Sequence, residues 1–212
     1  MRTSPLQVEH GDAVDRWITV GDMRLPYSFR TAGTHESLAM ADLSALARCG
    51  IKGPGAAEWL VGNGVPVPER HNRWVALVGG GMIGRLGHTE FFVEDGPRGN
   101  AVETIAGRFG IGAEGVYWVP HQDAAIVLSG ARVNEVLVQT CNINFSAIDW
   151  RDRELVMTSM VGVSVLVISR ENRYHLWCDP TFGPYLWRTL AAIVGELGGA
   201  PIGIGSIYPE LK

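Results

Sequence analysis

The stretch Ala47-Arg-Cys-Gly-Ile-Lys-Gly-Pro-Gly-Ala-Ala-Glu-Trp-Leu60 reads as a short apolar strand, a glycine turn and the start of a helix. The segment 126–137, Ile-Val-Leu-Ser-Gly-Ala-Arg-Val-Asn-Glu-Val-Leu, shows the same pattern. In both segments the helix closes on a glutamate, an apolar residue and a leucine. The matched positions lie 77 residues apart: Gly53 and Gly130, Glu58 and Glu135, Leu60 and Leu137. The chain therefore contains a candidate internal repeat.

The order of elements around the two copies is also the same. Each half reads as strand, helix, strand, strand and helix, with helices expected at 54–61, 101–109, 131–141 and 182–197. Because neither half could bury its sheet alone, two copies packed together would share a core. We therefore predict an α+β fold built from two tandem β-α-β-β-α repeats.

The expected domain organisation follows from this repeat. One domain covers 38–200, with halves at about 38–114 and 115–200, between an N-terminal arm at 1–37 and a C-terminal tail at 201–212. The arm is rich in turns, and its segment 14–20 alternates well enough for a strand. We expect the arm to wrap a neighbour or to add an edge strand. A partly disordered arm is equally consistent with the sequence.

The composition excludes several classes of function. The 212 residues carry a net charge of −4 and have a pI of about 5.9, which gives no sign of a nucleic-acid surface. Cys49, Cys141 and Cys178 are far apart, which favours a reduced, cytoplasmic setting and argues against structural zinc. The N-terminus lacks a signal-peptide core. The longest apolar run, 161–169, is too short to span a bilayer.

One group of polar residues could carry chemistry. Arg85, His88 and Glu90 lie together around an expected strand turn and could act as an acid–base and anion-binding cluster. Arg85 and Glu90 flank the turn and could pair across it. The simpler interpretation is an exposed ion pair, which would contribute roughly 0–1 kcal/mol to stability.

The other candidate ligands form no metal motif. His35-Glu36, His121-Gln-Asp123 and Asp179 are scattered over loops, without His-x-x-x-His or cysteine spacing. Cys49 falls in an expected buried strand and reads as a small core residue rather than as a reactive thiol.

Two further catalytic patterns are absent. No serine has a Gly-x-Ser-x-Gly setting, which argues against a nucleophile elbow at Ser44, Ser129 or Ser159. The run Gly80-Gly-Met-Ile-Gly84 precedes a strand rather than a helix, so dinucleotide binding is not expected.

The aromatic residues near the last helix suggest a contact surface. Trp177, Tyr185 and Trp187 cluster there, and the last two fall off the face that the helix period turns inward. They could meet a partner, since interfaces are enriched in aromatic residues. A local aromatic core cluster would explain them equally well.

Several short motifs of the sequence resemble those of a known superfamily. Asp42-Leu-Ser44 followed by Ile51-Lys-Gly-Pro-Gly-Ala-Ala-Glu-Trp-Leu60 is similar to the opening of the aminomethyltransferase superfamily of the glycine cleavage system. Within it, the gamma subunits of heterotetrameric sarcosine oxidases are the closer match. The resemblance extends over about 38–200 through further short matches: Pro66, Arg85-Leu-Gly-His-Thr-Glu90, 126–130, 136–137, Cys141, Gly162-Val163, 174–177 and 182–187. Their order and the total length carry the resemblance, because each motif alone is weak.

The resemblance implies a folate-binding type of fold and a multi-subunit complex. The gamma chain would sit with an alpha subunit that binds NAD and carries its own folate domain, a flavin-binding beta subunit and a small zinc-binding delta subunit. The complex, with FAD, FMN and tetrahydrofolate, demethylates sarcosine or a related N-methyl amino acid and passes on the one-carbon unit. In that family the gamma chain is regarded as accessory, so no cofactor is expected on this chain beyond weak folate binding.

The sequence departs from the catalytic relatives in two places. Aminomethyltransferases carry an Asp-containing run after a Gly-Gly turn, where the carboxylate faces the folate and its amine substrate. Here Gly79-Gly-Gly-Met-Ile-Gly-Arg-Leu-Gly87 has no carboxylate, and the next one is Glu90. The Lys-x-Cys-Tyr-x-Gly-Gln run of the iron–sulfur-associated branch is also absent, and Cys141 sits in Thr-Cys-Asn-Ile-Asn instead. No catalytic, cofactor-binding or metal-binding residue is therefore assigned.

Three hypotheses remain at the level of the sequence. The first is a non-catalytic gamma-type subunit that contacts the alpha and beta subunits of a flavin-dependent oxidase. The second is a stand-alone protein that binds a folate and transfers or senses a one-carbon group. The third is a homo-oligomeric relative without a partner, in which self-association covers the same apolar surface.

Overall fold

A computed structural model gives the structure of the chain and describes residues 2–30, 37–110 and 113–211. The chain divides into two compact units. Unit 1 comprises Met1–Ala45, Gln122–Trp150 and Val156–Lys212, and unit 2 comprises Leu46–His121 with Arg151–Leu155. Unit 2 is therefore almost one continuous stretch, whereas unit 1 is assembled from three segments. These boundaries differ from those of the predicted halves, 38–114 and 115–200.

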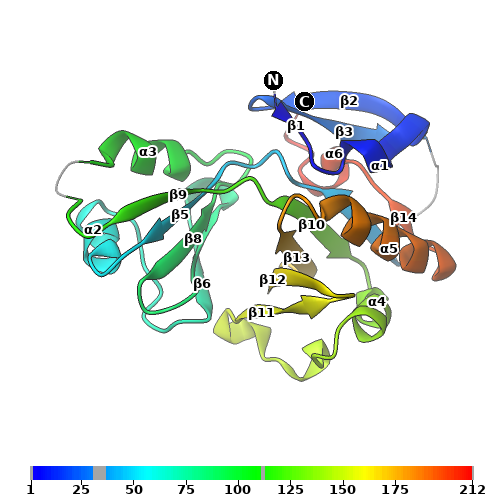
Figure 1. Cartoon of the computed structure of the whole chain (residues 1–212). Coiled ribbons are helices and arrows are strands. Elements are labelled where there is room, and N and C mark those ends of the chain that lie inside the picture. The colour runs from blue at the N-terminus through cyan, green and yellow to red at the C-terminus, as the bar shows by residue number, and fades with distance from the viewer. Residues whose placement is uncertain (1, 31–36, 111–112, 212) are drawn as a thin grey trace. The chain divides into compact units, whose positions relative to one another are not determined.

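Unit 2 is a five-stranded sheet with two helices (Figure 1). The strand order is β6-β7-β8-β5-β9, and all neighbours are antiparallel. The strands are β5 (Arg48–Lys52), β6 (Arg73–Ala76), β7 (Met82–Arg85), β8 (Glu90–Glu94) and β9 (Tyr117–Pro120). The helical segments are α2 (Ala56–Gly62), α3 (Ala101–Arg108) and a short 3₁₀ turn at Val78–Gly80.

The helices of unit 2 cover one face of its sheet. Trp59 and Leu60 of α2 and Ile105 of α3 are buried in one cluster with alternate residues of the strands, including Ile51 and Phe91. Such alternation is the pattern of a sheet with one face against helices. The buried face supplies the driving force for folding of unit 2, because burial of apolar area is the dominant favourable contribution.

Unit 1 contains a six-stranded sheet and a smaller three-stranded one. Their strand orders are β11-β12-β13-β10-β4-β14 and β1-β3-β2. The strands of the larger sheet are β4 (Ala39–Asp42), β10 (Ala124–Ser129), β11 (Leu155–Met160), β12 (Val163–Arg170), β13 (Arg173–Cys178) and β14 (Ala200–Pro201), and those of the smaller are β1 (Arg2–Thr3), β2 (Val14–Val20) and β3 (Met23–Phe29). The α-helices are α1 (Gln7–His10), α4 (Val133–Thr140), α5 (Gly183–Glu196) and α6 (Ile204–Ile207), and 3₁₀ turns lie at Gly11–Ala13, Phe145–Ala147 and Trp150–Asp152.

Helices α4 and α5 cover one face of the six-stranded sheet. Leu137 of α4 and Leu190 of α5 are buried in one cluster with Ile126 and Leu128 of β10. The four helices expected from sequence are confirmed to within two residues at each end, as α2, α3, α4 and α5. The strand expected at 14–20 is confirmed as β2. The mixed α+β class is therefore confirmed.

The two larger sheets share a pairing register. In one, β10 pairs with β4, and Ser129 lies opposite Ala39; in the other, β5 pairs with β9, and Lys52 lies opposite Tyr117. The other neighbour of β10 is β13, and that of β5 is β8; β13 and β8 are the second strands of the hairpins β12–β13 and β7–β8. Strand β4, which precedes β5 in sequence, thus lies in the sheet of β10, and β9, which precedes β10, lies in the sheet of β5.

The repeated glycine marks the same backbone position in both units. Gly53 and Gly130 have φ values of +118° and +110°, in the region that favours glycine. A Cβ on Gly53 would lie 2.1 Å from the carbonyl oxygen of Gly115, and one on Gly130 would lie 2.4 Å from that of Ser37. The glycine is therefore required for close approach of the helix start to a neighbouring strand.

The N-terminal residues 2–30 contain the three strands of the smaller sheet and belong to unit 1. Asp42 of β4 fixes them in place. Its Oδ2 accepts a hydrogen bond from Ser4 Oγ at 2.5 Å and lies 2.9 Å from His10 Nε2, while its Oδ1 accepts from the Ser44 amide at 2.8 Å. All three side chains are almost fully buried, so Asp42 joins the N-terminal segment to the sheet.

The N-terminal segment also covers part of α5, where Trp187 lies. Trp187 is buried, and its ring lies 5.0 Å from that of His10. The prediction that Trp187 faces away from the core is wrong, because the N-terminal segment supplies a second wall that the helix period alone does not reveal. Tyr185 is half exposed, as expected. In the expected tail 201–212, Ile204 and Ile207 of α6 are buried.

We predict that Asp42→Ala lowers the free energy of unfolding by about 3 kcal/mol, because it leaves buried partners without their acceptor. Urea denaturation followed by tryptophan fluorescence measures this. The matched control is Asp22→Ala, which removes an exposed carboxylate that pairs with Arg2 at 2.7 Å; its effect should be much smaller. Equal losses in the two variants would contradict the role assigned to Asp42.

Candidate functional site

The glycine turn before β7 is a point of close backbone packing. A Cβ on Gly79 would lie 2.5 Å from the carbonyl oxygen of Arg98, and one on Gly81 would lie 2.6 Å from that of Glu94. Gly79 also has a φ of +80°. Side chains are thus excluded at this turn, which fixes where β7 begins.

Strand β7 itself offers no carboxylate and little space for one. Gly84 lies opposite Phe92 in the sheet, and a Cβ at Gly84 would lie 2.4 Å from Cδ1 of Leu155. Leu155 is 2% exposed, so a larger residue at position 84 would displace a packed core side chain. This position therefore serves packing rather than chemistry.

The next residue, Arg85, is held by backbone carbonyl groups. Its Nη1 donates to the oxygens of Pro68 and Glu69 at 3.2 and 3.0 Å, its Nη2 to that of His88 at 2.9 Å, and its Nε to that of Gly87 at 3.3 Å. The guanidinium group also lies 5.4 Å from the ring centre of Phe91. Arg85 therefore closes the β7–β8 turn onto the loop before β6.

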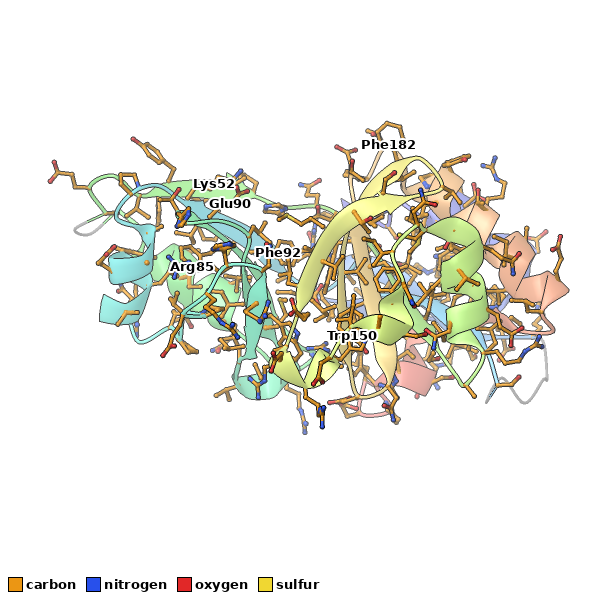
Figure 2. The ribbon with its side chains drawn as sticks, turned by 90° about the horizontal axis from the view of Figure 1, so that it is seen from below. Lys52, Arg85, Glu90, Phe92, Trp150 and Phe182 are labelled. Atoms are coloured by element: carbon orange, nitrogen blue, oxygen red, sulfur yellow. The ribbon has the colours of Figure 1, made fainter. Side chains whose placement is uncertain are left out.

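The predicted pairing of Arg85 with Glu90 is wrong. The β7–β8 register places Phe91 opposite Arg85, so that Glu90 projects from the other face of the sheet. Glu90 lies opposite Lys52 of β5 instead and forms an ion pair with it at 2.7 Å (Figure 2). The expected cluster of Arg85, His88 and Glu90 is thus split between two faces.

Two buried carboxylates near the glycine turn were not identified from the sequence. Glu94 at the end of β8 forms an ion pair with Arg48 of β5 at 2.6 Å, and both side chains are 1% exposed. The two residues lie directly opposite each other in the register. The only signal in the sequence was an acidic pair closing an apolar strand, Phe91-Phe-Val-Glu-Asp95, which also occurs at ordinary strand ends.

Asp95 contacts the start of the next helix, α3. Its carboxylate accepts hydrogen bonds from the backbone amides of Ala101 at 2.8 Å and Val102 at 3.3 Å, at the start of α3. Burial raises the pKa of this carboxyl group above its ordinary value, and the two amide hydrogen bonds oppose that rise. Asp95 therefore accepts hydrogen bonds from the free amides at the start of α3 from six residues upstream, whereas the N-cap position itself is Asn100.

The remaining candidates do not form a site in the described structure. His121 packs edge-on against Phe92 with ring centres 5.2 Å apart, and Asp179 accepts a hydrogen bond from the hydroxyl of Thr181 at 2.5 Å. Burial raises the pKa of the Cys49 thiol to about 12, and the residue is fully buried, as expected for a core cysteine. His35 and Glu36 lie outside the described residues. No group of three or more His, Cys, Asp or Glu side chains within 2–30, 37–110 and 113–211 could hold a metal ion.

Comparison with solved structures identifies the fold as that of an aminomethyltransferase. The glycine cleavage aminomethyltransferase T of Bartonella henselae superposes with a TM-score of 0.74 and 15% identity, over 96% of this chain and 60% of that one. The present chain thus spans about three fifths of that enzyme. A chain of heterotetrameric sarcosine oxidase from Corynebacterium sp. U-96, solved in complex with pyrrole 2-carboxylate, gives a TM-score of 0.64 and 18% identity, over 79% of this chain and 89% of that one.

These likenesses confirm at the level of fold the resemblance inferred from sequence. No family model matches the chain, and no curated protein matches it in sequence. None of the helices in the described part of the chain is long and apolar enough to cross a membrane.

We predict that Arg48→Leu lowers the free energy of unfolding by about 3–5 kcal/mol, because Glu94 would remain buried without its arginine. Urea denaturation measures the loss. Lys52→Leu is the matched control, since it removes the cation of a second β5–β8 ion pair whose side chains are about 40% exposed; this change should have little effect. A negligible loss in Arg48→Leu would show that the ion pair does not stabilise the sheet.

Proposed function

We propose that the chain is a non-catalytic, gamma-type accessory subunit of a heterotetrameric, flavin-dependent oxidase of sarcosine or another N-methyl amino acid. Such a complex demethylates its amine and passes the one-carbon unit to tetrahydrofolate. The observation that carries the proposal is β7, where Gly84 and a carbonyl-bound Arg85 follow the glycine turn in place of a carboxylate. The similarity in fold and length to a chain of a sarcosine oxidase supports it.

We also propose that the two larger sheets are tandem copies of one β-α-β-β-α unit. The pairing of β10 with β4 and that of β5 with β9 supports this, because Ser129 and Lys52, which are 77 residues apart, lie opposite Ala39 and Tyr117, which are 78 apart. The left-handed glycines Gly53 and Gly130 support it too, since each faces the backbone of the segment that leads into the neighbouring strand. In this interpretation the first strand of each copy completes the sheet of the other.

The proposed role leaves the cofactors on other subunits. FAD, FMN, NAD, tetrahydrofolate and zinc would belong to the partner chains, with at most weak folate binding here. The alpha and beta subunits would meet exposed aromatic side chains of this chain. Phe182 and Tyr185, at the start of α5, are 55% and 50% exposed and suit such a contact. Phe182 is labelled in Figure 2. The three free cysteines fit a reduced, cytoplasmic setting.

A second function would use the same fold without partners. A stand-alone folate-binding protein related to aminomethyltransferases would need a ligand site that does not depend on a carboxylate in β7. A homo-oligomer would cover the exposed aromatic residues with a second copy of the chain.

The proposal is tested by purifying the tagged chain from its native host and recording the absorbance spectrum of the eluate. We expect larger chains to co-elute and to bring the yellow absorbance of flavin, because the cofactors belong to the partner subunits. The same chain expressed alone should be colourless and inactive. Elution of the chain alone from its native host would contradict the subunit role and favour one of the partner-free alternatives.

A further inference from the structure

Unit 2 contains a polar pocket that the proposed function does not use. Its volume is about 430 Å³, and it lies among the loop before β6, the β7–β8 turn and the segment 151–155. Every side chain that lines it is charged or carries an amide or an imidazole group. A pocket of this composition suits a small polar ligand rather than an apolar one.

The charge of the pocket is positive although the chain as a whole is acidic. Three arginines line it, Arg70, Arg73 and Arg85, against two carboxylates, those of Glu69 and Glu154. Glu154 forms an ion pair with Arg73, with 2.5 Å between Oε2 and Nη1. Arg85 is held by neutral carbonyl groups, and no carboxylate of the described residues forms an ion pair with it. The cationic groups therefore outnumber the anions available to neutralise them.

Two imidazoles add donors at the mouth of the pocket. His71 and His88 come from different loops, yet their ring centres lie 5.2 Å apart, and both residues are exposed. Together with Arg70, which is also exposed, they present nitrogen atoms that can donate hydrogen bonds. Nitrogen atoms that donate hydrogen bonds, next to the positive charge of Arg70, suit an anionic oxygen.

Two polar atoms of the pocket lining lack partners. The Nε of Arg73 and the Oδ1 of Asn72 are buried without a hydrogen bond. Asn72 also has a φ of 57°, which is uncommon for a residue other than glycine. Buried donors and acceptors without partners are costly, and strained residues of this kind cluster at binding sites. A bound oxyanion could accept a hydrogen bond from Nε of Arg73, and an ordered water between the ligand and Asn72 could donate one to Oδ1.

We propose that this pocket binds a small oxyanion, a phosphate or a carboxylate group, through Arg70, His71 and His88, with Arg85 as a fixed positive charge. The two sources share the same chemistry, that of an anionic oxygen with several acceptor positions. This site does not depend on the proposed subunit role, because all of its residues lie in unit 2 of the chain itself.

The test is a titration of the tag-free chain with inorganic phosphate, and separately with acetate, at constant ionic strength. The imidazole signals of His71 and His88 are followed by NMR and assigned with His71→Gln and His88→Gln. We expect saturable shifts of both signals with at least one of the two anions, at a Kd on the order of 1 mM. The anion that binds more tightly identifies the source of the ligand.

The controls separate a site from general charge attraction. Arg70→Gln should weaken binding about tenfold, as expected for loss of one charge-assisted contact. Lys52→Gln removes an equal charge outside the pocket and should leave the Kd within about twofold. Absence of saturable shifts with both anions, or equal weakening by the two variants, would overturn the proposal. A circular dichroism spectrum of each variant confirms that it remains folded.

Discussion

The structure depends on the pairing of β5 with β9, where Cys49 stands opposite Pro120. This pairing closes unit 2 on itself, so that the chain enters and leaves it on adjacent strands. Pairing the two ends of this long segment has a loop-closure entropy cost that grows only slowly with the length of the segment. It also allows β4, just before unit 2 in sequence, to pair with β10, just after it. The position of β4 in turn fixes the N-terminal segment, because Asp42 of β4 is hydrogen-bonded to Ser4 and His10.

The parts of the fold that the sequence predicts are those set by short-range patterns. Apolar periodicity predicts helices α2 to α5. The turn pattern before α2 and α4 predicts that Gly53 and Gly130 occupy equivalent positions, and both have positive φ values. The resemblance to aminomethyltransferases rests on the same kind of short motif and on the order of these motifs along the chain.

The parts that could not be predicted depend on contacts distant in sequence. The register that separates Arg85 from Glu90 is set by which residues stand opposite each other across β7 and β8. The burial of Trp187 depends on His10, at the other end of the chain. The Arg48–Glu94 ion pair and the polar pocket likewise join loops and strands that sequence spacing alone does not bring together.

The chain has the fold of an aminomethyltransferase, and under the proposed role it would bind folate weakly or not at all. Gly79 packs against the backbone of Arg98 and Gly84 against the side chain of Leu155, so both ends of this stretch are fixed by close packing without a carboxylate. The most direct test is calorimetric titration of the isolated chain with tetrahydrofolate. We expect the isolated chain to bind tetrahydrofolate no more tightly than a Kd of about 1 mM. Saturable binding in the micromolar range would contradict it and would indicate a working folate site.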